Sequence, residues 1–206
     1  MCNFDWLIDK ALGLGAVQAR VIGAGAVVVE QRVTFKCRFG CPDYGRSYSC
    51  PPHSPSVEEF RRALGEYAQV LVVAFPTSAA LDGAGTGLQR TRHDPLADQA
   101  AKAQVERFYG DWETSKVAAF EATLELEREA FNAGNPLALA LRPGRCSLCD
   151  VCTNCVERGE CRERTRLRFS PEAVGVNLIA TCRAAHMDLV FPFVDNPCHI
   201  TMVLLG

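Results

Sequence analysis

The apolar positions of the chain fall into short compact runs that are separated by polar, glycine-rich stretches. Compact apolar runs of this length are typical of buried strands. They predict strands at QVLVVAF (69–75), PLALALRPG (136–144), LVFPF (189–193) and HITMVLLG (199–206). A β-branched run with polar interruptions predicts one more strand, from Ala26 to Lys36.

Four other segments show the spacing of apolar residues that is typical of helices. They are residues 4–12, VEEFRRALGEYA (57–68), Leu96 to Asn132, and SPEAVGVNLIATCRAAHM (170–187). Ser54 or Ser56 is expected to cap the second of these helices. Gly110 and the Thr114–Ser115 pair are candidate breaks in the third.

The order of these elements predicts the architecture. Strand, cysteine loop, helix and strand follow one another over residues 26–75, which is the order of a βαβ-type unit with the loop at its top. The expected fold class is α/β or α+β, with a mixed central sheet flanked by helices. We expect a single domain over residues 1–206, with cysteine-rich loops at 37–53 and 144–162. Both loops follow a predicted strand, and loops at the same strand ends lie close together.

Composition narrows the class of protein. The 206 residues include 22 Lys and Arg against 24 Asp and Glu, and the pI is about 6.1. Nucleic acid is not an expected partner, because there is no basic excess. The N-terminal segment lacks the basic start of a secretory signal, and its apolar stretch is too interrupted to span a membrane. We therefore expect a cytoplasmic protein that does not bind membranes.

The chain contains eleven cysteines, which indicate a more specific class of protein than the overall composition does. Disulfides are rare in the cytoplasm, and an odd number does not suit a fully paired framework, so metal binding is the better interpretation. Five of them lie in GRCSLCDVCTNCVERGEC (144–161), with the spacing C-x2-C-x2-C-x2-C-x5-C. They are Cys146, Cys149, Cys152, Cys155 and Cys161.

Successive C-x2-C turns are typical of [4Fe–4S] sites in ferredoxins, where a fourth cysteine follows three residues later and precedes Pro. Here Cys155 comes one residue too soon and Val156 follows it. The fourth ligand is therefore either Cys155 or Cys161. Structural zinc is the alternative, because paired C-x2-C turns also build zinc ribbons.

The first loop has the spacing C-x3-C-x8-C, at Cys37, Cys41 and Cys50. Three cysteines in a Gly/Pro-rich loop hold a cluster with one open iron, or need a fourth ligand from elsewhere. The candidates for that ligand are Cys182, Cys198 and His53. Apolar packing is the expectation for the two cysteines, and a solvated loop position for the histidine.

Four arginines flank the two loops: Arg38, Arg46, Arg142 and Arg145. They are candidates for offsetting cluster charge or for docking an acidic partner, but solvated surface is the expectation. No Ser-His-Asp or paired-carboxylate arrangement indicates a catalytic residue.

Two segments resemble the DUF2284 family of predicted metal-binding proteins. KCRFGCPDYG (36–45) and SCPPHSPSVEEF (49–60) match the family's Lys-Cys, Gly-Cys-Pro, Tyr-Gly and Cys-Pro-Pro order. GRCSLCDVC (144–152), Cys161 and RFSPEAVGVNL (168–178) form the second match. This chain departs from the family where Phe169, Pro171 and Asn177 replace Pro, Met and Asp.

The resemblance implies a metal-binding, iron–sulfur protein. Carried over by position, it implies the ligands Cys37, Cys41, Cys50, Cys146, Cys149, Cys152 and Cys161. Cys155 lies outside the family pattern, which favours Cys161 as the ligand.

Three functions follow from these expectations. The first is a small protein with one or two [4Fe–4S] clusters that passes electrons to a redox partner protein or serves a partner enzyme. The second is an iron–sulfur enzyme with an open iron at the first loop, acting as a Lewis acid. The third is a zinc-stabilised interaction module without redox activity.

Overall fold

The computed structural model describes residues 4–79, 94–156, 159–189 and 197–206. Its centre is an antiparallel sheet in the order β1-β2-β4-β3. The strands are β1 (Gln18–Gly23), β2 (Gln69–Pro76), β3 (Leu139–Leu141) and β4 (Cys198–Leu205). The helices are α1 (Asp5–Gly13), α2 (Val33–Gly40), α3 (Val57–Leu64), α5 (Gln99–Asn132), α6 (Thr153–Val156) and α7 (Leu178–Ala184), with 3-10 turns η1 (Ala24–Ala26) and η2 (Glu172–Val174).

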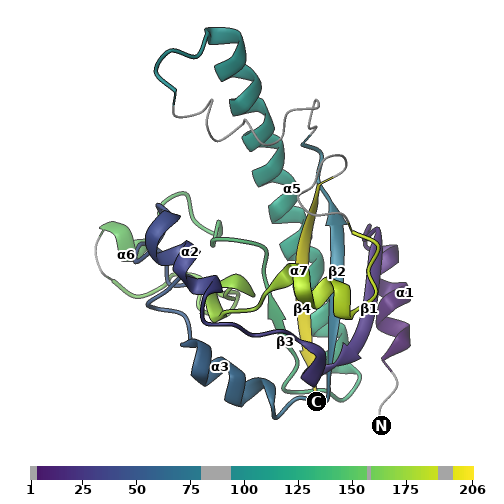
Figure 1. The fold of residues 1–206 in the computed structure, drawn as a ribbon. Helices are drawn as coiled ribbons and strands as arrows, with labels where there is room; N and C mark the ends of the chain where they lie inside the picture. Colours follow the sequence, from purple (N-terminus) through teal and green to yellow (C-terminus); the bar gives the residue numbers. More distant parts are fainter. Residues whose placement is uncertain (1–3, 80–93, 157–158, 190–196) are drawn as a thin grey trace.

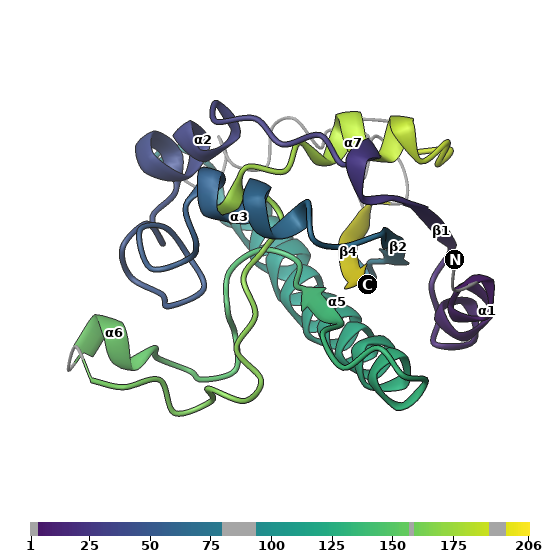
Figure 2. The ribbon, with the colours of Figure 1, turned by 90° about the horizontal axis from the view of Figure 1, so that it is seen from below.

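Helices cover both faces of the sheet (Figures 1 and 2). Alternate residues of a strand point to opposite faces, so Leu71 and Val73 of β2 pack with α1 and α5. Val70 and Val72 pack on the other face with α3 and α7. All residues of β4 are buried, because this strand lies between β2 and β3 and under both helical layers.

The expected fold class is confirmed in its α+β form, because every described strand pair is antiparallel. The predicted βαβ-type unit is wrong. A βαβ unit needs two parallel strands, but β1 and β2 run antiparallel and are direct neighbours.

The strand predicted from Ala26 to Lys36 is also wrong. Val29 makes only an isolated bridge to Val176, and α2 begins at Val33. The strand that pairs with β2 lies earlier, at Gln18–Gly23, and the 3-10 turn η1 directs the chain away from the sheet. A β-branched run becomes a strand only where a partner edge is free, and β1 already occupies this edge of β2.

The other predicted elements fall close to their expected places. The strands at 69–75, 136–144 and 199–206 correspond to β2, β3 and β4. Of the strand predicted at 189–193, only Leu189 lies within the described residues. Of the two predicted caps, Ser54 and Ser56, it is Ser56 that caps α3, through a capping box with Glu59.

Helix α5 is continuous through the predicted break points. The Thr114 hydroxyl donates to the carbonyl of Gly110 at 3.0 Å, and the Ser115 hydroxyl to that of Asp111 at 2.9 Å. A serine or threonine hydroxyl that donates to the backbone carbonyl four residues earlier has its hydrogen bond without breaking the helix. Within the described part of the chain, no helix is both long and apolar enough to cross a membrane.

The helix predicted over 170–187 is divided at Gly175, which has a φ of +90°. This left-handed conformation ends η2, and Asn177 then caps α7 through its side chain. The carbonyl of Gly175 accepts a hydrogen bond from the Glu30 backbone N–H at 2.8 Å. The turn therefore fixes α7 against the segment that leads into α2.

Replacing Gly175 by Ala is expected to lower the free energy of unfolding by about 1–3 kcal/mol. A Cβ there would lie 2.9 Å from Cγ2 of Val57 and 3.2 Å from the carbonyl oxygen of Glu30. Urea unfolding followed by circular dichroism measures the change. Gly110→Ala is the control and should raise stability by up to about 1 kcal/mol, because its added Cβ meets nothing within 4 Å. Equal destabilisation by both variants would contradict the strain at Gly175.

Candidate metal centre

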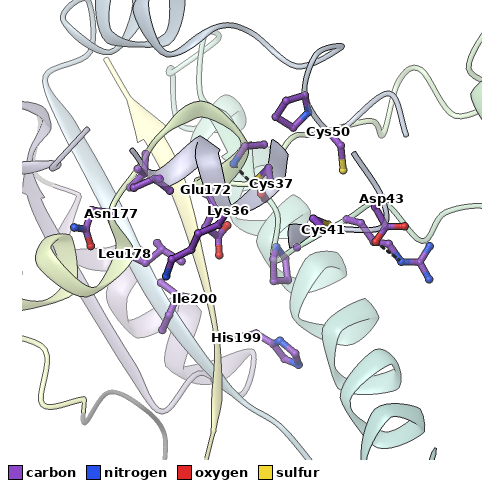
Figure 3. A pocket seen from close by; sticks show the side chains of 18 of the residues that line it. Lys36, Cys37, Cys41, Asp43, Cys50, Glu172, Asn177, Leu178, His199 and Ile200 are labelled. Carbon is purple, nitrogen blue, oxygen red and sulfur yellow. Dashed lines mark hydrogen bonds and ion pairs between the residues drawn. The ribbon is translucent and has the colours of Figure 1, made fainter. Parts of the chain in front are cut away.

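The first cysteine group, Cys37, Cys41 and Cys50, lines one cavity of about 880 Å³ (Figure 3). Cys37 lies within α2 rather than in a loop, and Cys41 follows the last residue of that helix. Burial, together with the neighbouring Cys41 thiol, raises the pKa of Cys37 to about 11. A metal that binds here must therefore displace the Cys37 proton.

Backbone turns place Cys50 opposite α2. Its N–H donates to the carbonyl of Ser47 at 3.0 Å, and its own carbonyl accepts from the N–H of His53 at 2.9 Å. Gly45 has a φ of +72° and donates to the Pro51 carbonyl at 2.9 Å, which folds the loop back on itself. The glycines and prolines of this segment thus bring Cys50 back toward Cys41.

The second cysteine group, Cys146, Cys149, Cys152 and Cys161, lines a smaller cavity of about 20 Å³. Burial and the neighbouring Cys146 thiol raise the pKa of Cys149. Cys155 belongs to the short helix α6, and the structure does not describe its side chain. Which of Cys155 and Cys161 is a ligand stays a prediction, although Cys161 lies with the three C-x2-C cysteines.

Within the described part of the chain, no three Cys, His, Asp or Glu side chains are arranged to hold a single metal ion.

The structure brings the two cysteine groups together. The Ser49 hydroxyl accepts a hydrogen bond from the N–H of Cys146 at 3.0 Å and lies 3.8 Å from Sγ of Cys50. Asn154 donates to the carbonyl of Gly45 at 3.1 Å. A single buried hydroxyl therefore contacts one cysteine of each group.

Arg142 lies between the groups and has no exposed surface. Its Nη2 donates to the Ser147 hydroxyl at 3.1 Å, and its guanidinium lies 4.3 Å from the centre of the Phe120 ring. Its Nε and Nη1 are buried without a hydrogen-bond partner among the described residues. Burial lowers the pKa of Arg142, and the charges of Cys146 and Cys50 oppose this shift. The expectation that Arg142 is solvated surface is wrong, because Phe120 and the end of β3 enclose it.

The other flanking arginines differ from Arg142. Arg38, Arg46 and Arg145 are exposed, as expected. Arg145 also lies at the rim of the cavity, where it approaches Asp43 at 3.6 Å.

The fourth-ligand candidates of the first group lie in different places. Cys182 is 1% exposed and packs in the apolar core, as expected. Cys198 also contacts this core but lines the same cavity as the first group. The ring of His53 bonds to Asn154 at 2.9 Å and packs edge-on against Tyr48, and it lines neither cavity.

A polar wall from α5 and β4 completes the large cavity. It comprises Trp112, Glu113, Lys116 and His199. Lys116 is 3% exposed and forms an ion pair with Glu113. Ser115 lies 3.0 Å from Nε2 of His199, and burial lowers the pKa of this histidine to about 4, so that it is neutral at pH 7.

Sequence reasoning missed this wall because its members form no motif. His199 is 84 residues from Ser115 in the chain. The one local sign is that Trp112 and Lys116 are four residues apart, which places them on one face of a helix.

Groups of closely spaced thiols are typical of metal-binding proteins. A family model described as a predicted metal-binding protein (DUF2284) matches residues 20–205, and the chain belongs to this family. The resemblance found in the sequence is thus confirmed. No match is found among curated proteins or among solved structures.

Replacing Ser49 by Ala is expected to lower the free energy of unfolding by about 1–3 kcal/mol, because the partly buried N–H of Cys146 loses its acceptor. Urea unfolding measures the change. Ser54→Ala is the matched control, since the Ser54 hydroxyl makes only a long 3.4 Å contact to the Ala173 carbonyl. A Ser49→Ala effect no larger than that of the control would show that the two groups do not depend on this hydroxyl.

Proposed function

We propose that this protein carries a [4Fe–4S] cluster at each cysteine group and passes single electrons to a partner enzyme. The observation that carries the proposal is the position of Arg142. Its guanidinium is buried, the charges of Cys146, Cys50 and Glu113 favour its charged form, and it forms no ion pair with any described carboxylate. One buried cation thus acts on a cysteine of each group of candidate ligands.

A buried arginine with two unpartnered donor nitrogens is costly in isolation. Burying a charge without a partner costs several kcal/mol, and each unmade hydrogen bond costs about 1–3 kcal/mol more. An anionic metal–thiolate centre on either side offsets this cost through its negative charge. Arg142 therefore fits a site whose cysteines are deprotonated and metal-bound.

Iron–sulfur is favoured over zinc by the spacing of the second group. Its Cys146, Cys149 and Cys152 repeat the C-x2-C turn without the long spacer that separates the two ligand pairs of most zinc sites. Thiolates in such a series are typical of cluster proteins. The cluster would supply one-electron chemistry, and the protein would set its potential through Arg142, backbone N–H groups and burial.

Exposed aromatic side chains beside the first group support a partner protein. Phe35 and Phe39 of α2 are 50% and 77% exposed, and their ring centres lie 6.1 Å apart. They flank Cys37 on the same helix. Large exposed aromatic residues are enriched where proteins dock, so this face of α2 is where we place the redox partner.

The cavity beside the first group supports a second candidate function, that of an enzyme. Three cysteines with an open iron act as a Lewis acid when a substrate can reach the iron. The cavity of about 880 Å³ provides that access. Cys198, which lines the same cavity, is the alternative fourth ligand that would close the site.

Metal analysis of anaerobically purified protein tests the proposal. We expect about eight iron and eight acid-labile sulfide per chain, as two four-iron clusters require. Cys161→Ser should lower both counts to about four, whereas Cys155→Ser should leave them unchanged. Loss of iron and sulfide in Cys155→Ser, but not in Cys161→Ser, would make Cys155 the ligand. Zinc without sulfide and without visible colour would overturn the electron-transfer proposal and leave a zinc-stabilised interaction module.

Replacing Arg142 by Met is expected to lower the reduction potentials of both clusters. Reduction adds negative charge, and a unit positive charge a few ångströms away stabilises it by a few kcal/mol at an effective dielectric constant of about 20. This corresponds to a shift on the order of 100 mV for one electron. A redox titration followed by electron paramagnetic resonance measures the potentials.

Arg142→Lys is the matched variant, because it keeps the charge and removes the planar donor group. Its potentials should remain close to those of the unmodified protein. An equal fall in both variants would mean that hydrogen bonds or packing, and not the charge of Arg142, set the potentials.

A further inference from the structure

The cavity beside the first cysteine group has the size of a small-molecule site. Its volume of about 880 Å³ lies in the range of roughly 300–1,000 Å³ that ligand pockets usually have. Cys41 and Cys50 lie toward one side, and Leu178 of α7 and Ile200 of β4 lie toward the other (Figure 3). Together with Val33 of α2, which is one helical turn before Cys37 and also lines the cavity, these two residues form its apolar wall. Neither candidate ligand group needs these apolar residues.

Most of the charged side chains that line the cavity are paired with one another. Arg32 pairs with Glu30 at 2.7 Å, and Arg145 approaches Asp43 at 3.6 Å. Lys116 pairs with Glu113. Within each pair, the two opposite charges neutralise each other.

Lys36 is different, because it forms no ion pair with any of the described residues. Glu172 also lines the cavity, but its Oε2 is buried and makes no hydrogen bond to Lys36. In Figure 3 the Lys36 side chain extends toward the side of the cavity where Leu178 and Ile200 lie. An unpaired and exposed ammonium thus lies next to the apolar wall.

We propose that this cavity binds a small monocarboxylate with an apolar body. The carboxylate pairs with the ammonium of Lys36, and the apolar body covers Val33, Leu178 and Ile200. The inference adds a ligand to the site of the proposed function. Only the role of the bound ligand beside the metal rests on that function. Binding itself depends on Lys36 and the apolar wall.

Equilibrium dialysis of the anaerobically purified full-length protein tests this inference, with hexanoate, butyrate and hexanamide as probes. Hexanoate should bind about two- to fivefold more tightly than hexanamide, because an ion pair with the exposed ammonium of Lys36 contributes up to about 1 kcal/mol. It should also bind about 16-fold more tightly than butyrate, because each of two further buried CH₂ groups contributes about fourfold. Iron is measured on the same samples.

Lys36→Gln should weaken hexanoate binding about two- to fivefold and leave hexanamide binding unchanged. Arg38→Gln is the matched control, because Arg38 is equally close to Cys37 in the chain and carries the same charge, but does not line the cavity. This control should leave hexanoate binding unchanged. The comparison separates a contact at Lys36 from the general charge around Cys37.

Two results would overturn the inference: no saturable binding of hexanoate to iron-loaded protein, or equal losses in Lys36→Gln and Arg38→Gln. Charge-dependent binding to protein without iron would support the carboxylate site and refute the cluster proposal. Failure of the ligand site is thereby distinguished from failure of the proposed function.

Discussion

The guanidinium of Arg142 is the group around which the two cysteine groups are arranged. It lies one residue beyond β3, is enclosed by the Phe120 ring of α5, and interacts with the charges of Cys50 and Cys146. A buried cation of this kind is stable only where negative charge compensates it. No described carboxylate forms an ion pair with it, although the charges of Glu113, Cys50 and Cys146 all favour its charged form. Under the proposed function, metal-bound thiolates of the two groups supply the remaining counter-charge.

The sheet explains why segments that are far apart in the sequence meet at this point. The central strand β4 pairs with β2 on one side and with β3 on the other, and β3 leads directly into Arg142 and the second cysteine group. Helix α5 crosses the same sheet and contributes Phe120 to one side of the guanidinium and Lys116 to the cavity. The sheet thus fixes the positions of groups that lie in loops and at helix ends.

The sequence could indicate which cysteines lie near one another, because the spacing within each group is local. A C-x2-C turn places two sulfurs near each other whatever the rest of the fold, and the compact runs at β2 and β4 could be assigned from composition alone. The run from Ala26 to Lys36 was misassigned because strand formation depends on a free partner edge, which a single segment does not reveal. Arg142 looked like any charged residue beside a loop, since its burial depends on Phe120, 22 positions earlier. The wall of Lys116 and His199 likewise arises only when α5 packs against β4.

Helix α2 lines the cavity, but substitutions on it are expected to cost little stability. It supplies Cys37, Lys36 and Val33 to the cavity, yet none of its residues is fully buried. Substitutions on it consequently remove little packing energy, whereas substitutions in β4 disturb a strand that is buried along its whole length. On the proposed ligand site, exchanges at α2 positions other than Cys37 would therefore change what the cavity accepts at little cost in stability. Because Lys36 and Val33 share this helix with Cys37, the choice of ligand and the candidate metal site are neighbours on one short segment.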